Sequence, residues 1–387
     1  MHISLVGFFK RYLSTPAGLT DGRNYLDECE SIRGLAILLV VLFHWLGTFT
    51  AYQPQPDPNP LAAFIYAGNS GVTLFFVLSG FLLSMPWFKG RTIRLNAFYR
   101  NRLLRIMPLY FILVSIAAFF HRDVSEGIRS LLFWDLGLLT LYPFGSVWKT
   151  LAIEMQFYLL LPLLMTFTLR NRLRFLGLFL LVLLSVGSVV LLAAPEAVFS
   201  SHVGALLQGN LLGRWPNFLM GITCAFLYVK LDGQNLKEKL RTSWLGRGGG
   251  DLVLLLILFL LSMQFSSVST LGIFPAETLF PARHAIEGIL WGLLILALIL
   301  LPLGSVGLFV NPVLNTLGIL SYSIYLLHYP LLISVMTAVT TNRPMWIATP
   351  GWPIGLLSVG LLLILLVLSA LTYVGIEKPF LSLKSRK

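Results

Sequence analysis

The chain has 387 residues, of which 57% are hydrophobic and only 11% charged, and its mean hydropathy is +0.82. Soluble domains carry about a quarter of their residues as charged side chains, so this composition excludes an ordinary soluble protein and predicts a polytopic protein embedded in a lipid bilayer. The net charge of +12 would suggest a nucleic-acid partner in a soluble chain, but in a membrane protein basic residues first report topology, and we predict no nucleic-acid partner.

The first 25 residues precede the first long apolar run. The short apolar stretch MHISLVGFF is followed by Lys10 and Arg11 without a small-residue cleavage site, which argues against a cleavable secretory signal. We expect residues 1–25 to form an amphipathic segment at the membrane surface, residues 26–380 to form one transmembrane domain, and residues 381–387 to form a basic cytoplasmic tail. Cys29 and Cys224 lie far apart, and we expect two unpaired thiols.

Ten apolar runs follow, each long enough to cross a hydrocarbon core of about 30 Å, which takes roughly 20 residues. Lys and Arg gather in the even-numbered connections and in the carboxyl tail. The positive-inside rule therefore predicts an all-α bundle of about ten spans in the inner (cytoplasmic) membrane, with both termini cytoplasmic. The runs lie near residues 31–50, 69–88, 103–120, 147–168, 175–194, 210–229, 251–268, 285–304, 316–338 and 353–375.

Two segments between these runs are predicted not to cross the membrane. The stretch YQPQPDPNP at 52–60 has prolines at alternating positions, which exclude helix and favour an extended outer loop. The stretch at 131–143 is too short to span and contains Asp135, so we expect it to be re-entrant or interfacial.

The first span carries Arg33 at its edge and His44 in its interior, eleven residues further on. Eleven steps of 100° place both side chains on nearly the same helix face, about 16 Å apart along the axis. Ionisable groups inside a membrane are costly and commonly functional. His44 is thus a candidate functional residue, although a histidine bonded to a backbone carbonyl is the alternative interpretation.

Two further spans place ionisable residues at a similar depth. Counted at 1.5 Å per residue, His44 lies roughly 20 Å from the inner side, Glu154 about 10 Å below the outer side, and His328 roughly 18 Å from the inner side. In a core about 30 Å thick these depths coincide. Glu154 has an alternative role as the structural partner of an arginine, and His328 is equally well explained by packing hydrogen bonds.

Five local motifs follow one another in order. They are the Arg33 and His44 pair, GVTLFFVLSGFLLS at 71–84, RNRLLRIMPLYF at 100–111, VWKTLAIEMQFYLLLPLL at 147–164 and LGILSYSIYLLHYPLL at 317–332. Together they resemble the acyltransferase 3 family of integral-membrane O-acyltransferases, over about residues 26–380. One departure is Lys149, where the family commonly has a serine.

The resemblance implies an enzyme that transfers an acyl group, commonly acetyl, from cytoplasmic acyl-CoA to a hydroxyl of an acceptor. The acceptor is often a sugar of a cell-surface glycan. A small hydroxylated molecule such as a macrolide is an alternative acceptor, and a glycan-precursor transporter or flippase is an alternative function. We predict no metal cofactor, because no His-x-x-x-His or Cys-x-x-Cys spacing occurs.

Acyl transfer needs a base for the hydroxyl proton, a group that orients the base, and donors for the developing oxyanion. We expect His44 to be the base and Glu154 to orient it, with His328 as a further catalytic candidate. Ser79 is a candidate oxyanion donor or acyl carrier. Tyr322 and Tyr325 are further candidate oxyanion donors, and with Trp148 they are the candidate substrate-binding residues.

The donor would bring several phosphates to the inner surface. Arg102 and Arg105, three residues apart, share a helix face and can bind phosphate, and Arg33 lies at the inner edge of the first span. The alternative is that these arginines are topology anchors. His284 and Glu287, at the outer start of the eighth span, are expected to pair at the surface.

Overall fold

The structure is a computed structural model that describes residues 26–50, 59–133, 141–170, 174–193, 210–271, 280–343, 345–346 and 351–384. Within these ranges the regular structure is entirely helical, which confirms the all-α class. The predicted surface segment 1–25, most of the loop at 52–60, the centre of the segment at 131–143 and the last three tail residues lie outside the described residues.

Each predicted span coincides with a helix in the described part of the chain. Eight of these helices are long and apolar enough to cross a membrane, and α8 and α11 occupy the positions of the other two predicted spans. The ten are α2 (Asp27–Thr50), α4 (Ser70–Phe88), α5 (Leu95–His121), α7 (Lys149–Arg170), α8 (Arg174–Ala193), α11 (Leu211–Lys230), α13 (Gly249–Leu271), α15 (Phe280–Leu300), α18 (Ser321–Asn342) and α20 (Trp352–Thr372).

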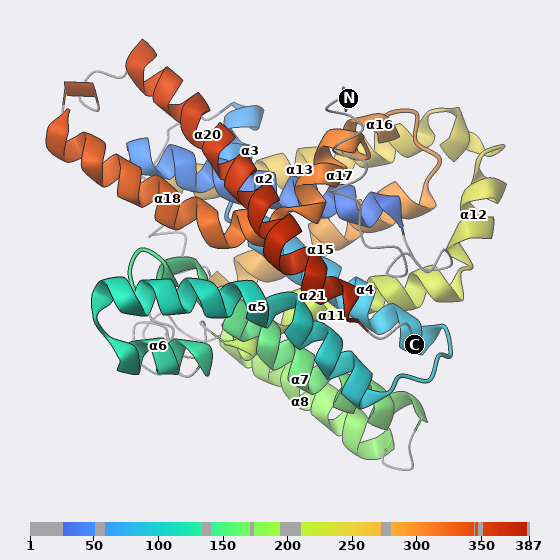
Figure 1. The fold of residues 1–387 in the computed structure, drawn as a ribbon. Coiled ribbons are helices and arrows are strands. Elements are labelled where there is room, and N and C mark those ends of the chain that lie inside the picture. The colour runs from blue at the N-terminus through green and yellow to red at the C-terminus, as the bar shows by residue number, and fades with distance from the viewer. Residues whose placement is uncertain are drawn as a thin grey trace, which may run out of the picture.

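Short helices connect or end several of these elements. They include α3 (Pro60–Tyr66), α6 (Val124–Leu131), α12 (Gly233–Leu240), α17 (Pro312–Ile319) and α21 (Lys378–Ser382). Figure 1 shows α12 and the carboxyl end of the chain at one end of the bundle, and α6 with the end of α18 and the start of α20 at the other. The termini were predicted to be cytoplasmic, and that orientation remains a prediction.

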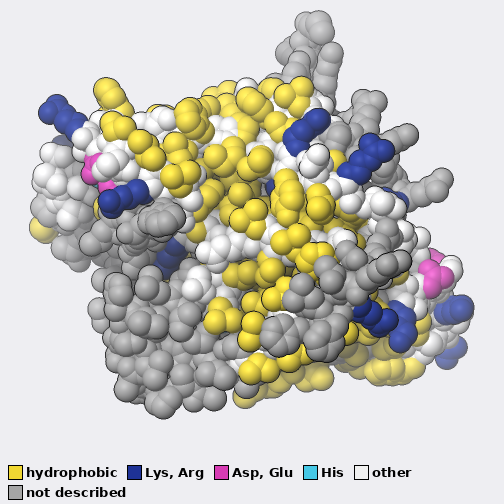
Figure 2. Space-filling model, turned by 90° about the horizontal axis from the view of Figure 1, so that it is seen from below, with side chains coloured by type: hydrophobic (Ala, Val, Ile, Leu, Met, Phe, Trp, Pro, Cys, Tyr) yellow, Lys and Arg dark blue, Asp and Glu magenta, His cyan; other side chains and the backbone are white. Residues whose placement is uncertain are grey.

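The outer surface carries the apolar residues that a lipid environment requires. Figure 2 shows a broad apolar face, with Lys and Arg side chains mostly near the edges of the view. Along α20 the exposed large side chains include Leu356, Val359, Leu363 and Val367. Because a soluble protein seldom exposes a continuous apolar face of this kind, the structure is that of a multi-pass membrane protein.

Several of the described helices approach each other closely at glycines, as is common in membrane bundles. At the crossing of α4 with α11, a Cβ on Gly221 would lie 2.0 Å from the carbonyl oxygen of Val77, and one on Gly80 would lie 2.3 Å from that of Phe218. At the crossing of α2 with α17, a Cβ on Gly34 would lie 1.9 Å from the carbonyl oxygen of Leu314. Arg33 immediately precedes Gly34, and Ser79 immediately precedes Gly80. The close contacts at these glycines therefore hold the backbone next to both residues in place.

Gly221→Ala should therefore destabilise the protein, because the new methyl group meets backbone that cannot move independently of its helix. We expect a loss of about 1–3 kcal/mol in the free energy of unfolding, the usual size for overpacking. Thermal unfolding in detergent measures it. The matched control is Gly360→Ala in α20, where no atom lies within 4 Å of the added Cβ; equal midpoints for the two variants would contradict the packing argument.

Candidate active site

A cavity of ≈ 100 Å³ lies among α2, α4, α5, α7 and α18, near the end of the bundle where α5 begins. Its lining combines three cations and one acid with hydroxyl and apolar side chains. The charged and hydroxyl-bearing residues of the lining are Arg33, Arg102, Arg105, Glu154, Ser79, Thr150, Tyr158, Ser321, Tyr322 and Tyr325. Seven of the ten site residues predicted from the sequence thus meet in one cavity.

The three arginines of the cavity differ in their partners. Arg33 donates through one guanidinium nitrogen to both carboxylate oxygens of Glu30, at 2.9 Å each. Arg102 lies over the rings of Phe98 and Tyr158, with 5.8 Å from its guanidinium carbon to each ring centroid, and its buried Nε has no hydrogen-bond partner. Arg102 and Arg105 form no ion pair among the described residues, which leaves their charges available to an anionic ligand.

The carboxylate of Glu154 is held by two hydroxyl groups. Ser79 Oγ donates to Glu154 Oε1 at 2.9 Å, and the hydroxyl of Tyr158, one helical turn further along α7, donates to the same oxygen. This network joins α4 to α7 across the cavity. The proton of Ser79 is therefore used by Glu154, and Ser79 is not a free oxyanion donor in this arrangement.

The hydroxyl groups of Tyr322 and Tyr325 are also occupied. Tyr322 donates to the carbonyl oxygen of Ile106 at 2.7 Å, and Tyr325 donates to that of Val147 at 2.9 Å and contacts the hydroxyl of Thr150. Because a hydroxyl carries one proton, neither tyrosine has a second one for an oxyanion. The expectation that these hydroxyls act as oxyanion donors is therefore not met in this structure.

His44 and His328 lie beside each other, with their ring centroids 5.1 Å apart. His328 is buried, and its Nδ1 lies 2.8 Å from the carbonyl oxygen of Tyr325 and 3.1 Å from that of Ile324. A carbonyl only accepts, so Nδ1 of His328 carries the proton and its Nε2 is an acceptor. His328 Nε2 and His44 Nδ1 are both buried without a hydrogen-bond partner.

The histidine pair lies outside the lining of the arginine cavity. Tyr325 connects the two places, because it lines the cavity and its ring centroid is 5.8 Å from that of His328. No hydrogen bond joins Glu154 to His44 among the described residues. The predicted pairing of these two residues is corrected: Glu154 belongs to the cavity network, and His328 is the neighbour of His44.

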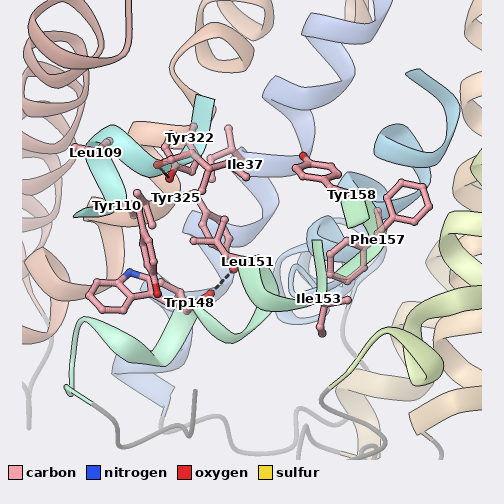
Figure 3. Close-up of a cluster of buried hydrophobic side chains, with 14 of the residues drawn as sticks. Ile37, Leu109, Tyr110, Trp148, Leu151, Ile153, Phe157, Tyr158, Tyr322 and Tyr325 are labelled. Carbon is pink, nitrogen blue, oxygen red and sulfur yellow. Dashed lines mark hydrogen bonds between the residues drawn. The ribbon is translucent and has the colours of Figure 1, made fainter. Parts of the chain in front are cut away.

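Trp148 lies in the hydrophobic core and not in the cavity wall. It is completely buried, and its indole packs against the ring of Tyr110 at 5.1 Å and that of Phe144 at 6.3 Å. Figure 3 shows Trp148 beside Tyr110 and well separated from Tyr158. Trp148 therefore does not line the cavity in which substrate contact was predicted. Its indole instead packs at the start of α7, the helix that carries Glu154.

A second polar cluster lies inside the bundle, where the sequence had predicted surface pairing. Glu287 is fully buried, forms an ion pair with Arg283 at 3.2 Å, and is 2.9 Å from Nδ1 of His284. Thr73 from α4 donates at 3.2 Å to Oε2 of Glu287, the same oxygen that contacts His284. The surface interpretation is wrong. The sequence did contain a signal for this burial: Arg283, His284 and Glu287 lie within five positions of an apolar helix. Ionisable groups in such a helix usually face the interior of the bundle.

The fold and the cavity thus define a multi-pass helical membrane protein with a cationic internal site. Residues 25–374 match the family described as "Acyltransferase domain". The chain therefore belongs to the acyltransferase 3 family, as its motifs indicated.

Several characterised relatives are similar at low identity. The chain is 25% identical over 346 residues to the O-acetyltransferase OatA of Staphylococcus aureus, covering 80% of this chain and 51% of the relative. It is 24% identical over 165 residues to the peptidoglycan O-acetyltransferase OatA of Listeria monocytogenes, covering 36% and 24%. It therefore spans about half or less of the length of these O-acetyltransferases.

A third relative is covered more fully. A protein of Komagataeibacter xylinus, named provisionally as the membrane-bound transacylase BcsY, is 24% identical over 396 residues, which cover 94% of this chain and 85% of the relative. No solved structure matches this chain.

Proposed function

We propose that this protein is an O-acyltransferase that moves an acyl group, most simply acetyl, from cytoplasmic acyl-CoA to a hydroxyl of an acceptor. The observation that carries the proposal is the cavity in which Arg33, Arg102 and Arg105 converge, while Arg102 and Arg105 have no carboxylate partner in the part of the chain that the structure describes. Buried cations are costly unless an anion accompanies them. The phosphates of CoA are anions of the required kind, and guanidinium groups bind them in bidentate fashion.

The spacing along α2 suits such a donor. Arg33 and His44 are eleven residues apart on one helix, which corresponds to about 16 Å along its axis. CoA carries its phosphates and its thioester at opposite ends of an extended pantetheine arm. With the phosphates at the arginines, the arm would run past Tyr325, so that the thioester arrives at the histidine pair.

At that position His44 would act as general base. Its imidazole accepts the proton of the acceptor hydroxyl while the hydroxyl oxygen attacks the thioester carbonyl. The tetrahedral intermediate then collapses, the carbon–sulfur bond breaks, and the CoA thiolate leaves and takes up the proton. His328 lies against His44 with an acceptor nitrogen, so we assign it to orienting His44 and the substrate hydroxyl, with transfer of the proton between the imidazoles available.

A variant of this route passes through a covalent acyl-enzyme on His44 or Ser79. Incubation with acyl-labelled CoA alone, followed by denaturation, tests it. Label that remains on the protein, and is lost in the corresponding single-residue variant, would establish the intermediate. Full activity without any label would leave direct attack as the route.

For the acceptor we propose a sugar hydroxyl of a cell-surface glycan or its precursor. The names of the two OatA relatives, one of them a peptidoglycan O-acetyltransferase, support this choice. A cytoplasmic donor also supports location in the inner membrane, with the arginine end of the bundle facing the cytoplasm, in agreement with the positive-inside rule.

The decisive experiment is transfer of labelled acetyl from acetyl-CoA by the purified protein in nanodiscs. The acceptor panel contains peptidoglycan fragments, other bacterial glycans and small hydroxylated metabolites, including macrolides. We expect labelled ester on a glycan. Ester on a small molecule alone would replace the acceptor assignment, and no transfer to any acceptor, together with glycan transport in sealed vesicles, would replace the enzyme assignment with a transporter.

A further inference from the structure

The carboxyl end of the chain folds back onto the helix that carries two of the cavity arginines. After α20 a π-helical turn covers Tyr373–Glu377 and leads into α21, which packs against α5. Arg100 donates from Nη2 to the carbonyl oxygen of Leu383 at 2.7 Å, and Glu377 accepts a hydrogen bond from Ser323 of α18. These bonds hold the segment after α21 beside the start of α5.

This arrangement buries Lys384, whose exposed fraction is only 9%. Its ammonium group forms no ion pair among the described residues. A lysine side chain is long and flexible enough that its ammonium group normally reaches water. Burial without a carboxylate partner disfavours the charged form of the ammonium group, and a bound anion would stabilise that form.

The groups that face Lys384 are mostly cations as well. Burial, together with the charges of Arg105, Arg102 and Arg33, lowers the pKa of Lys384 to about 6, while the charge of Glu377 opposes this shift. The same three arginines line the cavity. Lys384 therefore lies within the field of the proposed donor site, at the end where the donor's phosphates would bind.

We propose that Lys384 is a fourth phosphate-binding residue of this site, held in place by α21 and directed at a phosphate of the donor's nucleotide portion. The proposal rests on the proposed use of acyl-CoA. It assigns to the carboxyl-terminal segment a direct part in donor recognition, in addition to the three arginines predicted from the sequence.

Proton linkage distinguishes this role from a structural one. At pH 7 an ammonium group with a pKa of about 6 is largely neutral in the free protein. A phosphate beside it raises that pKa, so binding should take up protons and should become tighter as the pH falls from 8 towards 6. An arginine at this position stays charged, and its complex should form without this proton uptake.

The test is titration calorimetry of CoA, 3′-dephospho-CoA and pantetheine into the protein in nanodiscs, in buffers of different ionisation enthalpy. Lys384→Met should weaken CoA binding about 10-fold, Lys384→Arg should restore it without proton uptake, and Lys378→Met at the start of α21 should change neither. Pantetheine should bind all variants alike. If the effect of Lys384→Met disappears with 3′-dephospho-CoA, the partner is the 3′-phosphate; if it persists, the partner is the pyrophosphate.

Two results separate the failure of this inference from the failure of the proposed function. If the wild-type protein does not bind CoA, the proposed donor is wrong and the inference falls with it. If the wild type binds CoA and Lys384→Met binds it equally well, only the inference is overturned. Lys384→Met without donor should unfold at the same or a higher temperature than the wild type, and loss of the fold would show that Lys384 serves the structure instead.

Discussion

His44→Ala should reduce acyl transfer by about 10²–10⁴-fold, the usual contribution of a general base, while donor binding stays intact. His44 is outside the lining of the arginine cavity, and its ring contacts are to other aromatic rings and to His328. Removing the imidazole therefore removes the base and leaves the phosphate site unchanged. The measurement is the initial rate of labelled acetyl transfer in nanodiscs, with the dissociation constant for CoA determined on the same preparation.

Two further histidine variants make the result interpretable. His121→Ala alters an exposed residue at the end of α5 and should leave the rate unchanged. His328→Ala should reduce the rate less than His44→Ala, because His328 orients His44 in our proposal. A His44→Ala enzyme that retains most of its transfer rate would remove His44 from the mechanism, and a rate for His328→Ala below that of His44→Ala would exchange their roles.

The helices were predictable because a membrane span is defined by a length of apolar sequence. Local interactions account for the differences in their ends. The predicted ninth span at 316–338 is divided into α17 and α18. The first of these begins earlier than predicted, at Pro312, because Asn311 accepts hydrogen bonds from the amides of Val313 and Leu314. The third helix, α5, also begins earlier than predicted, at Leu95 instead of near residue 103. Both Arg102 and Arg105 therefore lie inside the helix.

The arginine cavity was predictable in part because helical spacing fixes which side chains on one helix share a face. Arg102 and Arg105 were expected together on this ground, and both line the cavity. The adjacency of His44 and His328 also agrees with their predicted depths. Depth alone does not give the direction in which a side chain points, and for this reason Glu154 was wrongly paired with His44.

Tertiary contacts account for the remaining differences. The hydroxyl groups of Tyr322 and Tyr325 bond to backbone carbonyls of other helices, and no local pattern announces such a partner. Nor does the sequence show that Glu287 on α15 accepts a hydrogen bond from Thr73 on α4, a helix far away in the sequence. These contacts depend on which helices are neighbours, and that information requires the assembled bundle.

The division of the interior into two zones has a mechanistic consequence. Cations gather in the cavity, whereas the histidine pair lies in an aromatic setting formed by Phe43, Tyr325 and Tyr329. A charged donor head group is stabilised in the first zone, and a neutral imidazole is stabilised in the second. Loss of donor binding and loss of chemistry should therefore be separable by mutation.

Arg102→Ala combined with Arg105→Ala should weaken CoA binding by at least about 100-fold, because each substitution removes charge-assisted hydrogen bonds to phosphate. Transfer at saturating donor should fall much less, since neither arginine contacts the histidine pair. The matched control is Arg91→Ala with Arg94→Ala, two exposed arginines just before α5, which changes the net charge equally. The dissociation constant for CoA and the apparent KM for acetyl-CoA check the prediction. Equal weakening in both double variants would indicate a general effect of surface charge, and an unchanged constant for Arg102 and Arg105 would exclude the cavity as the phosphate site.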